Sequence, residues 1–329
     1  MNSSAGPSKP PQVAILTPVY NEEESLPLYF EAIRTTLLCR ADYDFHVILI
    51  DDGSRDRSWD LIRAMCSRDA RFEGIRLSRN YGSHIALSAG FLHARGDAVA
   101  TLACDLQDPP EVILHFLAEW RKGSRIVWGK RRNRQDRWWR IWTSKVFAVL
   151  LRRFAMPPGS KFTTGSFLLV DKRVVECIRQ FQEHNRIIFT LVAWTGFEQS
   201  VVEYDRKERR AGTSGWTFGT MLKTMYDGFV SFSTLPIRLM TWVGIGAFLG
   251  TLGLSVYLLV CWVTGNPAPG WTSIMLALGF FFGLQFVLMG VSGEYLSRIY
   301  TEAVRRPLFF ISDRTPPPGG RKQRWTKIA

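Results

Sequence analysis

The chain has 329 residues and a formal net charge of +13, with 42 Lys and Arg against 29 Asp and Glu. So strong a positive charge predicts an anionic partner, such as a nucleic acid, an anionic lipid or a phosphorylated substrate. The five cysteines are scattered, odd in number and form no CxxC motif, which argues against a disulfide framework or a zinc site and is typical of a reducing compartment.

Residues 1–11 are polar and rich in proline. They lack the apolar core of a signal peptide, so we expect a disordered lead-in. From Gln12 to about Val202, apolar runs of strand length alternate with helical patterns. Val13–Leu16 is a continuous apolar run, as in a parallel strand that is covered on both faces. A helix is expected to begin near Ser25.

Val47–Ile50 is a second run of this kind, and a helical pattern follows it around Trp59–Met65. A short strand is expected at Gly74–Leu77, a helix at Ser83–Ala94 and another strand at Ala98–Cys104. This alternation predicts an α/β fold with a doubly wound parallel sheet, whose ligands bind at the carboxyl ends of the strands.

Two acidic residues, Asp51 and Asp52, directly follow the second strand. Their carboxylates could accept hydrogen bonds from a nucleobase N–H or a ribose hydroxyl, which predicts nucleotide binding. A simple turn is the alternative, since Asp-Gly-Ser is good turn chemistry, but a turn does not need two adjacent acids. The chain has neither a GxGxxG nor a GxxxxGK[ST] loop, which favours a diphosphate held by a metal and arginines over dinucleotide or ATP binding.

An acidic segment, Asp105–Glu111, follows the strand that ends at Cys104. Acidic groups at the end of a buried strand are costly unless a cation binds there. Asp105 and the side-chain oxygen of Gln107 could both reach one hard divalent cation, Mg²⁺ or Mn²⁺. Helix capping is the second interpretation, and it explains the rest of the segment: Asp108 would cap a helix that the two following prolines open.

Residues 121–153 combine a high density of arginine with tryptophan. A surface that faces a bilayer is the favoured interpretation, because tryptophan prefers the membrane interface and arginine prefers anionic headgroups. Binding of single-stranded nucleic acid and a simple solvated helix face are the alternatives. The residues concerned are Trp128, Arg131, Arg132, Arg134, Arg137, Trp138, Trp139, Arg140 and Trp142.

Two runs without charged residues, Leu239–Val263 and Trp271–Ser292, occupy the C-terminal part of the chain. Each is long enough to span a bilayer, which needs about 20 residues. Residues 264–270 form a short turn, so we expect two antiparallel membrane helices; a buried hairpin in a soluble core is the alternative. Because the turn carries no Lys or Arg while both flanks are basic, the positive-inside rule places both termini in the cytoplasm.

An ordered set of motifs now gives the chain a family resemblance. The motifs are Thr17–Glu22, Asp51–Ser54, Arg79–His84, Ala89–Gly90, Asp105–Glu111, Arg209–Ser214, Gly293–Tyr300 and Arg306–Pro307. From about Val13 to Ile311 the chain resembles the family 2, GT-A fold polyprenyl-phosphate glycosyltransferases, which include dolichyl-phosphate mannose synthase and bacterial undecaprenyl-phosphate glucosyltransferases. The resemblance implies a cytoplasmic GT-A (Rossmann-like) domain at 12–212, an amphipathic juxtamembrane segment at 213–238, membrane helices at 239–263 and 271–292, and a basic cytoplasmic tail at 293–329.

The resemblance also implies roles by position. The expected nucleotide-binding residues are Pro18, Tyr20, Glu22 and Asp52, together with Asp51. The expected metal ligands, which also hold the diphosphate, are Asp105 and Gln107. The expected catalytic residues are Asp105, Gln107, Arg131 and Arg209, and the two arginines and Ser214 would contact the acceptor phosphate.

Three positions depart from the family pattern. Ala103 stands where many members carry the first Asp of a DxD motif, so either the metal shell is thinner here or a water fills the position. Ser166 stands where many members carry Asp, and Gly215 replaces a lysine that often follows the Gly-x-Ser. These departures bear on substrate placement rather than on the class of reaction.

The implied function is inverting transfer of a sugar from a nucleotide diphosphate sugar, UDP-glucose or a similar donor, to polyprenyl phosphate at the cytoplasmic membrane face. Undecaprenyl phosphate is the expected acceptor, and modification of cell-envelope glycans the expected use. Glucose, mannose, N-acetylhexosamine and aminoarabinose-type sugars remain open, as does the nucleobase. The resemblance also implies a homo-oligomer, which is a tetramer in similar proteins. It implies no nucleic-acid partner. Nucleotide binding is expected to survive deletion from Leu239 to the C-terminus.

Two alternatives come from other classes. A non-catalytic membrane adaptor on a decayed transferase fold would explain the departures at Ala103, Ser166 and Gly215. A processive polysaccharide synthase would need a QxxRW motif and more membrane helices, and the residues after Gln135 do not have that spacing.

Overall fold

The structure is a computed structural model. It describes residues 9–132, 161, 166–184, 186–206, 235–264 and 270–315. The chain divides into two units: residues 1–222 together with 307–329, and residues 223–306.

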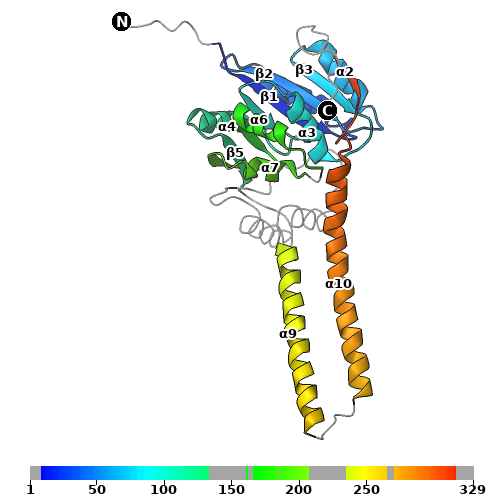
Figure 1. The fold of residues 1–329 in the computed structure, drawn as a ribbon. Coiled ribbons are helices and arrows are strands. Elements are labelled where there is room, and N and C mark those ends of the chain that lie inside the picture. Colours follow the sequence, from blue (N-terminus) through cyan, green and yellow to red (C-terminus); the bar gives the residue numbers. More distant parts are fainter. Residues whose placement is uncertain are drawn as a thin grey trace. The chain divides into compact units, whose positions relative to one another are not determined.

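Within the described residues, the first unit is built on an eight-stranded sheet with the strand order β7-β5-β6-β4-β1-β2-β3-β8 (Figure 1). The strands are β1 (Gln12–Val19), β2 (Asp44–Asp51), β3 (Phe72–Leu77), β4 (Ala98–Thr101), β5 (Ile126–Arg131), β6 (Leu168–Asp171), β7 (Gln199–Tyr204) and β8 (Ile311–Arg314). The helices of this unit are α1 (Leu26–Thr36), α2 (Ser58–Arg68), α3 (Ser83–His93), α4 (Val112–Arg121), α6 (Lys172–Gln180) and α7 (Ile188–Trp194).

The side chains of the central strands alternate between two hydrophobic layers. Val13 and Ile15 of β1 pack with α1, α2 and α4 on one face of the sheet. Ala14 and Leu16 pack with α3, α6 and α7 on the other face. Helices therefore cover both faces, which is why the central strands read as continuous apolar runs in the sequence. This confirms the predicted α/β class and the predicted strands and helices between Val13 and His93.

The prediction of a parallel sheet was wrong in part, because the sheet is mixed. β1 is parallel to β2 and β4, β2 to β3, and β5 to β7. β6 is antiparallel to both β4 and β5, and β8 is antiparallel to β3. The apolar run of β6, Leu168–Val170, is fully buried like that of a parallel strand, so hydrophobic pattern does not reveal its direction.

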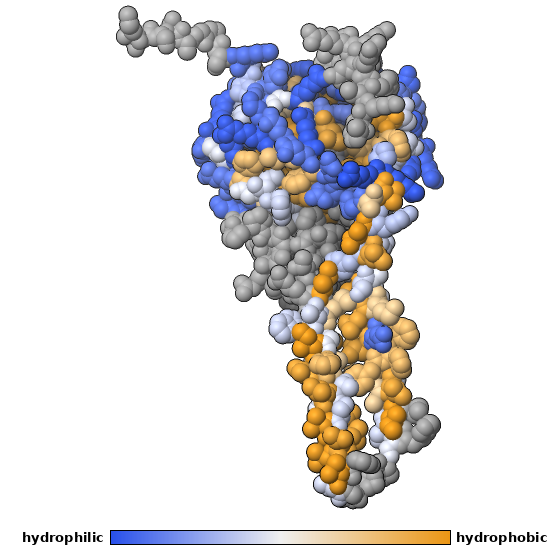
Figure 2. Space-filling view, in the orientation of Figure 1, coloured by the Kyte–Doolittle hydropathy of each residue, from blue (hydrophilic) through white to orange (hydrophobic). Residues whose placement is uncertain are grey.

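The second unit contains two long helices, α9 (Leu235–Val263) and α10 (Trp271–Val304). By length and composition alone, Leu239–Cys261 and Ala277–Val304 could each cross a membrane, and neither segment has its apolar stretch buried inside the structure. The surface of the two helices is mostly orange in Figure 2, with paler and blue patches between the hydrophobic side chains. The two predicted apolar helices are thus present, and their orientation in a membrane remains a prediction.

Helix α10 continues beyond Ser292, where the predicted span ends. This added part carries charges, among them an ion pair between Glu294 and Arg298 at 2.9 Å, four residues apart. The tail expected at 293–329 is therefore partly structured: it begins in helix, and Ile311–Arg314 forms the edge strand β8. Residues 213–234 of the expected amphipathic segment lie outside the described residues.

Candidate active site

The candidate site lies where three parallel strands end side by side. β1 is the middle strand of β4-β1-β2, and the register pairs Leu16 with Thr101 and Val19 with Asp51. The loops after β1, β2 and β4 therefore leave the sheet at the same edge, which is where ligands bind in open α/β sheets. These loops, together with the ends of the strands that lead into them, carry most of the predicted site residues.

The loop after β1 is hydrogen-bonded to the loop after β2. The backbone N–H of Asn21 donates to the hydroxyl of Ser54 at 3.0 Å, and that of Glu22 donates to Ser58 at 2.9 Å. The carboxylate of Glu22 accepts a bond from the Ser25 hydroxyl at 2.7 Å. Tyr20 is 43% exposed at this edge, so its ring presents a face on which a nucleobase could stack.

The side chain of Asp51 makes its contacts in the interior of the protein and not at its surface. Its side chain is 0% exposed, and it accepts a hydrogen bond from the backbone N–H of Ser54 at 3.0 Å. Its second oxygen lies 3.1 Å from Nε of Arg76, as an ion pair rather than an aligned hydrogen bond. Burial raises the pKa of Asp51, and the bonds from Ser54 and the charge of Arg76 oppose that rise. Asp51 therefore shapes the turn that follows β2.

The turn also requires glycine at position 53. Gly53 has a φ of 71°, which L side chains rarely adopt. A Cβ at this position would lie 2.5 Å from the carbonyl carbon of Arg79. The turn after β2 and the loop after β3 are thus in direct backbone contact.

Asp52 connects these two loops. Its two carboxylate oxygens accept hydrogen bonds from the backbone N–H groups of Tyr81 and Gly82, each at 2.8 Å. The residue is 3% exposed, and burial raises the pKa of the carboxyl group while the two N–H donors lower it. Asp52 therefore joins the motifs 51–54 and 79–84.

A hollow of about 440 Å³ opens beside the β1 loop and is lined by Asn21, Glu22, Glu23, Glu24, Ser25, Arg55 and Asp56. Four of these side chains are acidic, so this hollow is unfavourable for phosphate groups. It includes one predicted nucleotide residue, Glu22, and neither predicted metal ligand. We expect a diphosphate on the other side of β1, towards the loop after β4.

The loop after β4 holds the predicted metal ligands. Asp105 and Gln107 are both half-buried, and Leu106 between them has a φ of 54°. The backbone N–H of Gln107 donates to Oδ1 of Asp105 at 3.2 Å, so the two residues belong to one tight turn. Among the described residues no group of three His, Cys, Asp or Glu side chains could hold a metal. A cation here would take part of its oxygen shell from a bound diphosphate, as Mg²⁺ commonly does.

Asp108 does not cap the following helix, and that prediction was wrong. The N-cap of α4 is Glu111, without a side-chain cap bond. Asp108 is instead buried, accepts a hydrogen bond from the hydroxyl of Tyr204 at 2.6 Å and lies 3.4 Å from Nε of Arg206. These two partners, at and just after the end of β7, offset the free-energy cost of burying the carboxylate. Asp108 thereby anchors the loop that carries Asp105.

Arg131 lies at the end of β5, paired in register with Tyr204 of β7. Its Nε is buried and has no hydrogen-bond partner among the described residues. Through Tyr204 and Asp108 it is connected to the Asp105 loop, although β6 separates β5 from β4 in the sheet. The structure thus brings together one predicted phosphate-binding arginine and the predicted metal loop.

Several predicted residues fall elsewhere. Arg209, Ser214 and Gly215 lie outside the described residues. Ser166 is described and exposed, and its backbone carbonyl accepts a hydrogen bond from Thr101 at 2.6 Å. Trp128 is 0% exposed and donates to Gln199 at 2.9 Å, so its assignment to a bilayer-facing surface was wrong; it belongs to the core.

Sequence reasoning missed Tyr204 and Arg76. Tyr204 ends a strand with no motif around it, so nothing local marks it. Arg76 is a charged residue between the buried residues Ile75 and Leu77 of β3. A charge within a buried strand needs a partner, and this signal could have identified Arg76.

Replacing Tyr204 with phenylalanine should destabilise the first unit. The substitution removes the hydroxyl that donates to the buried Asp108, and an unsatisfied buried acceptor costs about 1–3 kcal/mol. We expect the Tm of the full chain in detergent to fall by several degrees, because 1 kcal/mol shifts a domain of this size by about 2–4 °C. Tyr43→Phe is the matched control, since Tyr43 is also a buried tyrosine but packs its ring against the guanidinium of Arg121. Equal melting of the two variants would contradict the anchoring role.

Comparisons with known proteins found a matching family and relatives that are similar over most of the chain. Residues 14–179 match the model of the glycosyl transferase family 2. An uncharacterized glycosyltransferase of Synechocystis sp. is 36% identical over 92% of this chain and 95% of its own length. The bactoprenol glucosyl transferase of Shigella phage SfV is 34% identical over 92% of this chain and 98% of its own length. The undecaprenyl-phosphate 4-deoxy-4-formamido-L-arabinose transferase of Pseudomonas savastanoi pv. phaseolicola is 36% identical over 91% of this chain and 89% of its own length.

Proposed function

Because the chain belongs to glycosyl transferase family 2, we propose that this glycosyltransferase moves a sugar from a nucleotide diphosphate sugar, UDP-glucose or a similar donor, to a polyprenyl phosphate. The observation that carries the proposal is that relatives named for bactoprenol and undecaprenyl phosphate are similar over nine tenths of the chain. That span includes the apolar helices as well as the sheet. Undecaprenyl phosphate is therefore the proposed acceptor. The proposed product is a polyprenyl-monophosphate sugar that serves the modification of cell-envelope glycans.

The two apolar helices support a lipid acceptor. An enzyme that joins a water-soluble donor to a lipid phosphate must work where the phosphate emerges from the bilayer. We infer that α9 and α10 span the membrane with both termini in the cytoplasm, from the uncharged turn and the basic flanks. The sheet would then face the compartment in which nucleotide sugars are made.

The donor nucleoside is proposed to bind at the loops after β1 and β2. Tyr20 presents an exposed ring, Glu22 lies on the same loop, and Pro18 lies near the end of β1, just before that loop. Asp52 holds the neighbouring loop at Tyr81 and Gly82, and the remaining lone pairs of its carboxylate can accept a nucleobase N–H or a ribose hydroxyl. Asp51 contributes by shaping the turn, because its side chain is fully buried.

The residues after β4 fit a divalent cation. Asp105 supplies a carboxylate and Gln107 an amide oxygen, which are the hard donors that Mg²⁺ and Mn²⁺ prefer. When bound, the cation would neutralise charge on the departing nucleoside diphosphate. Asp105 and Gln107 would orient the diphosphate, and Asp108 would keep their loop in place through Tyr204.

The acceptor phosphate needs alignment rather than activation. It is already anionic near neutral pH, so no strong general base is required. Arg131 and Arg209 would clamp it, with Ser214 beside them, because a guanidinium can bind a phosphate with two parallel hydrogen bonds. One oxygen of the acceptor phosphate would attack the anomeric carbon of the sugar and form a new C–O bond. The bond from that carbon to the nucleoside diphosphate would break on the opposite side, which inverts the configuration.

A transfer assay tests the proposal. Purified full-length protein is incubated with labelled nucleotide sugars, undecaprenyl phosphate and Mg²⁺ or Mn²⁺, and lipid-extractable label is measured. A single sugar on the lipid is expected. Absence of label with every donor would favour the adaptor alternative, and a polymer on the acceptor would favour a processive synthase.

Arg209→Lys should lower turnover about tenfold, although it keeps the charge. The lysine ammonium is a point charge and loses the planar fork that binds phosphate bidentately. Initial rates of the lysine and alanine variants are compared at saturating donor over a range of acceptor concentrations. If the lysine variant matched the wild type while the alanine variant was inactive, a single charge would suffice and the bidentate clamp would be wrong.

A further inference from the structure

Arg76 is placed where it can hold the turn after β2. Its Nε lies 3.1 Å from Oδ2 of the buried Asp51, and its Nη2 donates to the backbone carbonyl of Ser54 at 3.0 Å. Through these two contacts Arg76 binds both the first and the last residue of the Asp51–Ser54 turn. The guanidinium makes these contacts through two different nitrogens of one rigid plane, a geometry that the single nitrogen of a lysine ammonium does not reproduce.

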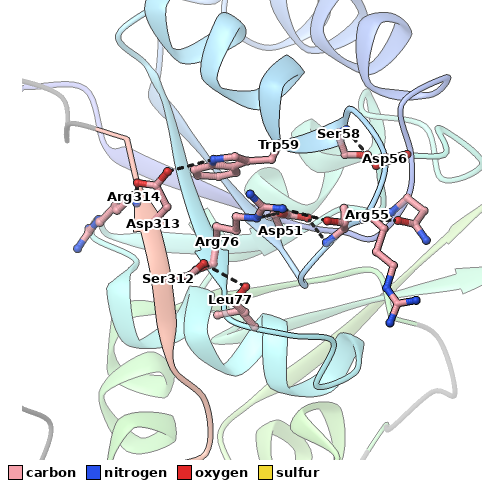
Figure 3. A network of polar contacts seen from close by, with 12 residues as sticks. Asp51, Arg55, Asp56, Ser58, Trp59, Arg76, Leu77, Ser312, Asp313 and Arg314 are labelled. Atoms are coloured by element: carbon pink, nitrogen blue, oxygen red, sulfur yellow. Dashed lines mark hydrogen bonds and ion pairs between the residues drawn. The ribbon is translucent and has the colours of Figure 1, made fainter.

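The guanidinium of Arg76 is in turn held by a tryptophan. Its central carbon lies 5.8 Å from the ring centroid of Trp59 in α2, within the range of a cation–π contact. The indole Nε1 of Trp59 donates to Oδ2 of Asp313 in β8 at 3.2 Å. Figure 3 shows these side chains in sequence, from Asp313 through Trp59 and Arg76 to Asp51.

The strand that carries Asp313 is firmly attached to the sheet. Asp313 pairs in register with Arg76 itself. Its neighbour Arg314 forms an ion pair with the buried Glu73. The backbone N–H of Gly74 donates to the hydroxyl of Thr315 at 2.7 Å. β8 is therefore a structural part of the domain that contains the nucleotide site, although it follows α10 in the chain.

We propose that Arg76 is a positioning residue for nucleotide binding, and that β8 fixes its orientation through Asp313 and Trp59. The inference rests on the proposed function, because it concerns the nucleotide that the turn after β2 would bind. Arg76 has no contact with the nucleotide in this account. It holds the side-chain carboxylate of Asp51 and the backbone carbonyl of Ser54, and so sets the place of Asp52 and of the loop that Asp52 binds at Tyr81 and Gly82.

This arrangement changes one expectation from the sequence. Deletion from Leu239 to the C-terminus removes both apolar helices, but it also removes β8. Without Asp313 the indole of Trp59 loses its hydrogen-bond acceptor, so the ring that packs against the Arg76 guanidinium is no longer held in place. We therefore expect such a truncation to weaken nucleotide binding, where the sequence alone predicted that binding would survive.

The experiment is calorimetric titration of the full-length chain in detergent with UDP and, separately, with GDP, each with Mn²⁺. The variants are Arg76→Ala, Arg76→Lys and Asp313→Ala. Arg314→Gln is the matched control, because it alters the same strand and breaks the pair with Glu73 but leaves Asp313 and Trp59 unchanged. The titration separates the dissociation constant from the fraction of protein that binds.

We expect Arg76→Ala to raise the Kd about tenfold, the size of effect typical of a lost charge-assisted contact. The Kd of Arg76→Lys should lie between those of Arg76→Ala and the wild type, and Asp313→Ala should raise the Kd several-fold. The binding stoichiometry should stay unchanged in all of them, and Arg314→Gln should keep the wild-type Kd. An unfolded fraction would lower the stoichiometry and leave the Kd of the folded molecules as it was.

Three results would overturn the proposal. A wild-type Kd in both Arg76→Lys and Asp313→Ala would remove the positioning role while leaving the proposed function intact. A fall in stoichiometry without a change in Kd would show that the network only stabilises the fold. An equal rise in Kd for Arg314→Gln and Asp313→Ala would rule out the route through Trp59. If the wild type bound neither nucleotide, the proposed function itself would fail, and this inference with it.

Discussion

Replacing Asp105 with asparagine should lower the rate of sugar transfer by at least tenfold, and by up to about a hundredfold. The reason is the composition of the loop after β4. Ala103 stands where the resemblance implied a first acidic ligand, so Asp105 and the neutral Gln107 are the oxygen donors proposed for the cation. The substitution keeps the shape of the side chain and removes its charge. Initial rates are measured over a range of Mg²⁺ and Mn²⁺ concentrations at saturating donor.

The controls for Asp105→Asn separate charge from folding. Asp105 is half-buried rather than enclosed, so the Tm should stay close to that of the wild type. Glu31→Gln removes an acid from the exposed face of α1 and should leave the rate unchanged. A variant that reached the wild-type rate at saturating metal would show that Asp105 is not the principal ligand.

Replacing Asp52 with asparagine should raise the Kd for the donor nucleotide more than tenfold. Both carboxylate oxygens accept backbone N–H donors, from Tyr81 and Gly82. An asparagine can offer one oxygen, and its NH₂ group would face the second N–H, so one of the two bonds is lost. An unsatisfied buried donor costs about 1–3 kcal/mol, and the loop after β3 would move away from the nucleotide.

Titration of Asp52→Asn with UDP and with GDP measures this effect. Asp60→Asn is the control, since Asp60 is exposed on α2 and should leave the affinity unchanged. A wild-type Kd for Asp52→Asn, together with a lowered Tm, would mean that Asp52 only stabilises the loops. The nucleoside would then be held by the loop after β1.

The same carboxylate gives nucleotide binding a pH dependence. Burial raises the pKa of Asp52 above its usual 3.8, so the carboxylate gains a proton at a higher pH than an ordinary aspartate does. The protonated group is a weaker acceptor for Tyr81 and Gly82, and affinity should fall as the pH is lowered towards that raised pKa. Above it, affinity should be constant. Titrations between pH 4 and pH 7 should show this fall in the wild type, and Asp52→Asn should lack this component.

The structure gives different contacts to residues that the sequence analysis had grouped together. Asp51 and Asp52 were expected together as nucleotide-binding acids, and the structure gives them different tasks: Asp51 is fully buried against Ser54 and Arg76, while Asp52 joins two loops. In the same way, Asp105 and Asp108 belong to one acidic segment, yet only Asp108 is anchored to Tyr204. Adjacent residues of one type share a pattern, and their burial depends on which distant strand packs against them.

The sequence by itself determined the α/β alternation, the loops that carry polar residues, the two apolar helices and the family resemblance. All of these depend on residue type and spacing within short stretches, where periodicity and turn chemistry are local. Only the tertiary structure decided the direction of β6, the core position of Trp128 and the use of Asp108. It also decided that β8 completes the sheet edge, since Trp59 and Asp313 are hydrogen-bonded across a separation of 254 residues. Contacts at such separation arise from the packing of the whole chain, and no local pattern contains them.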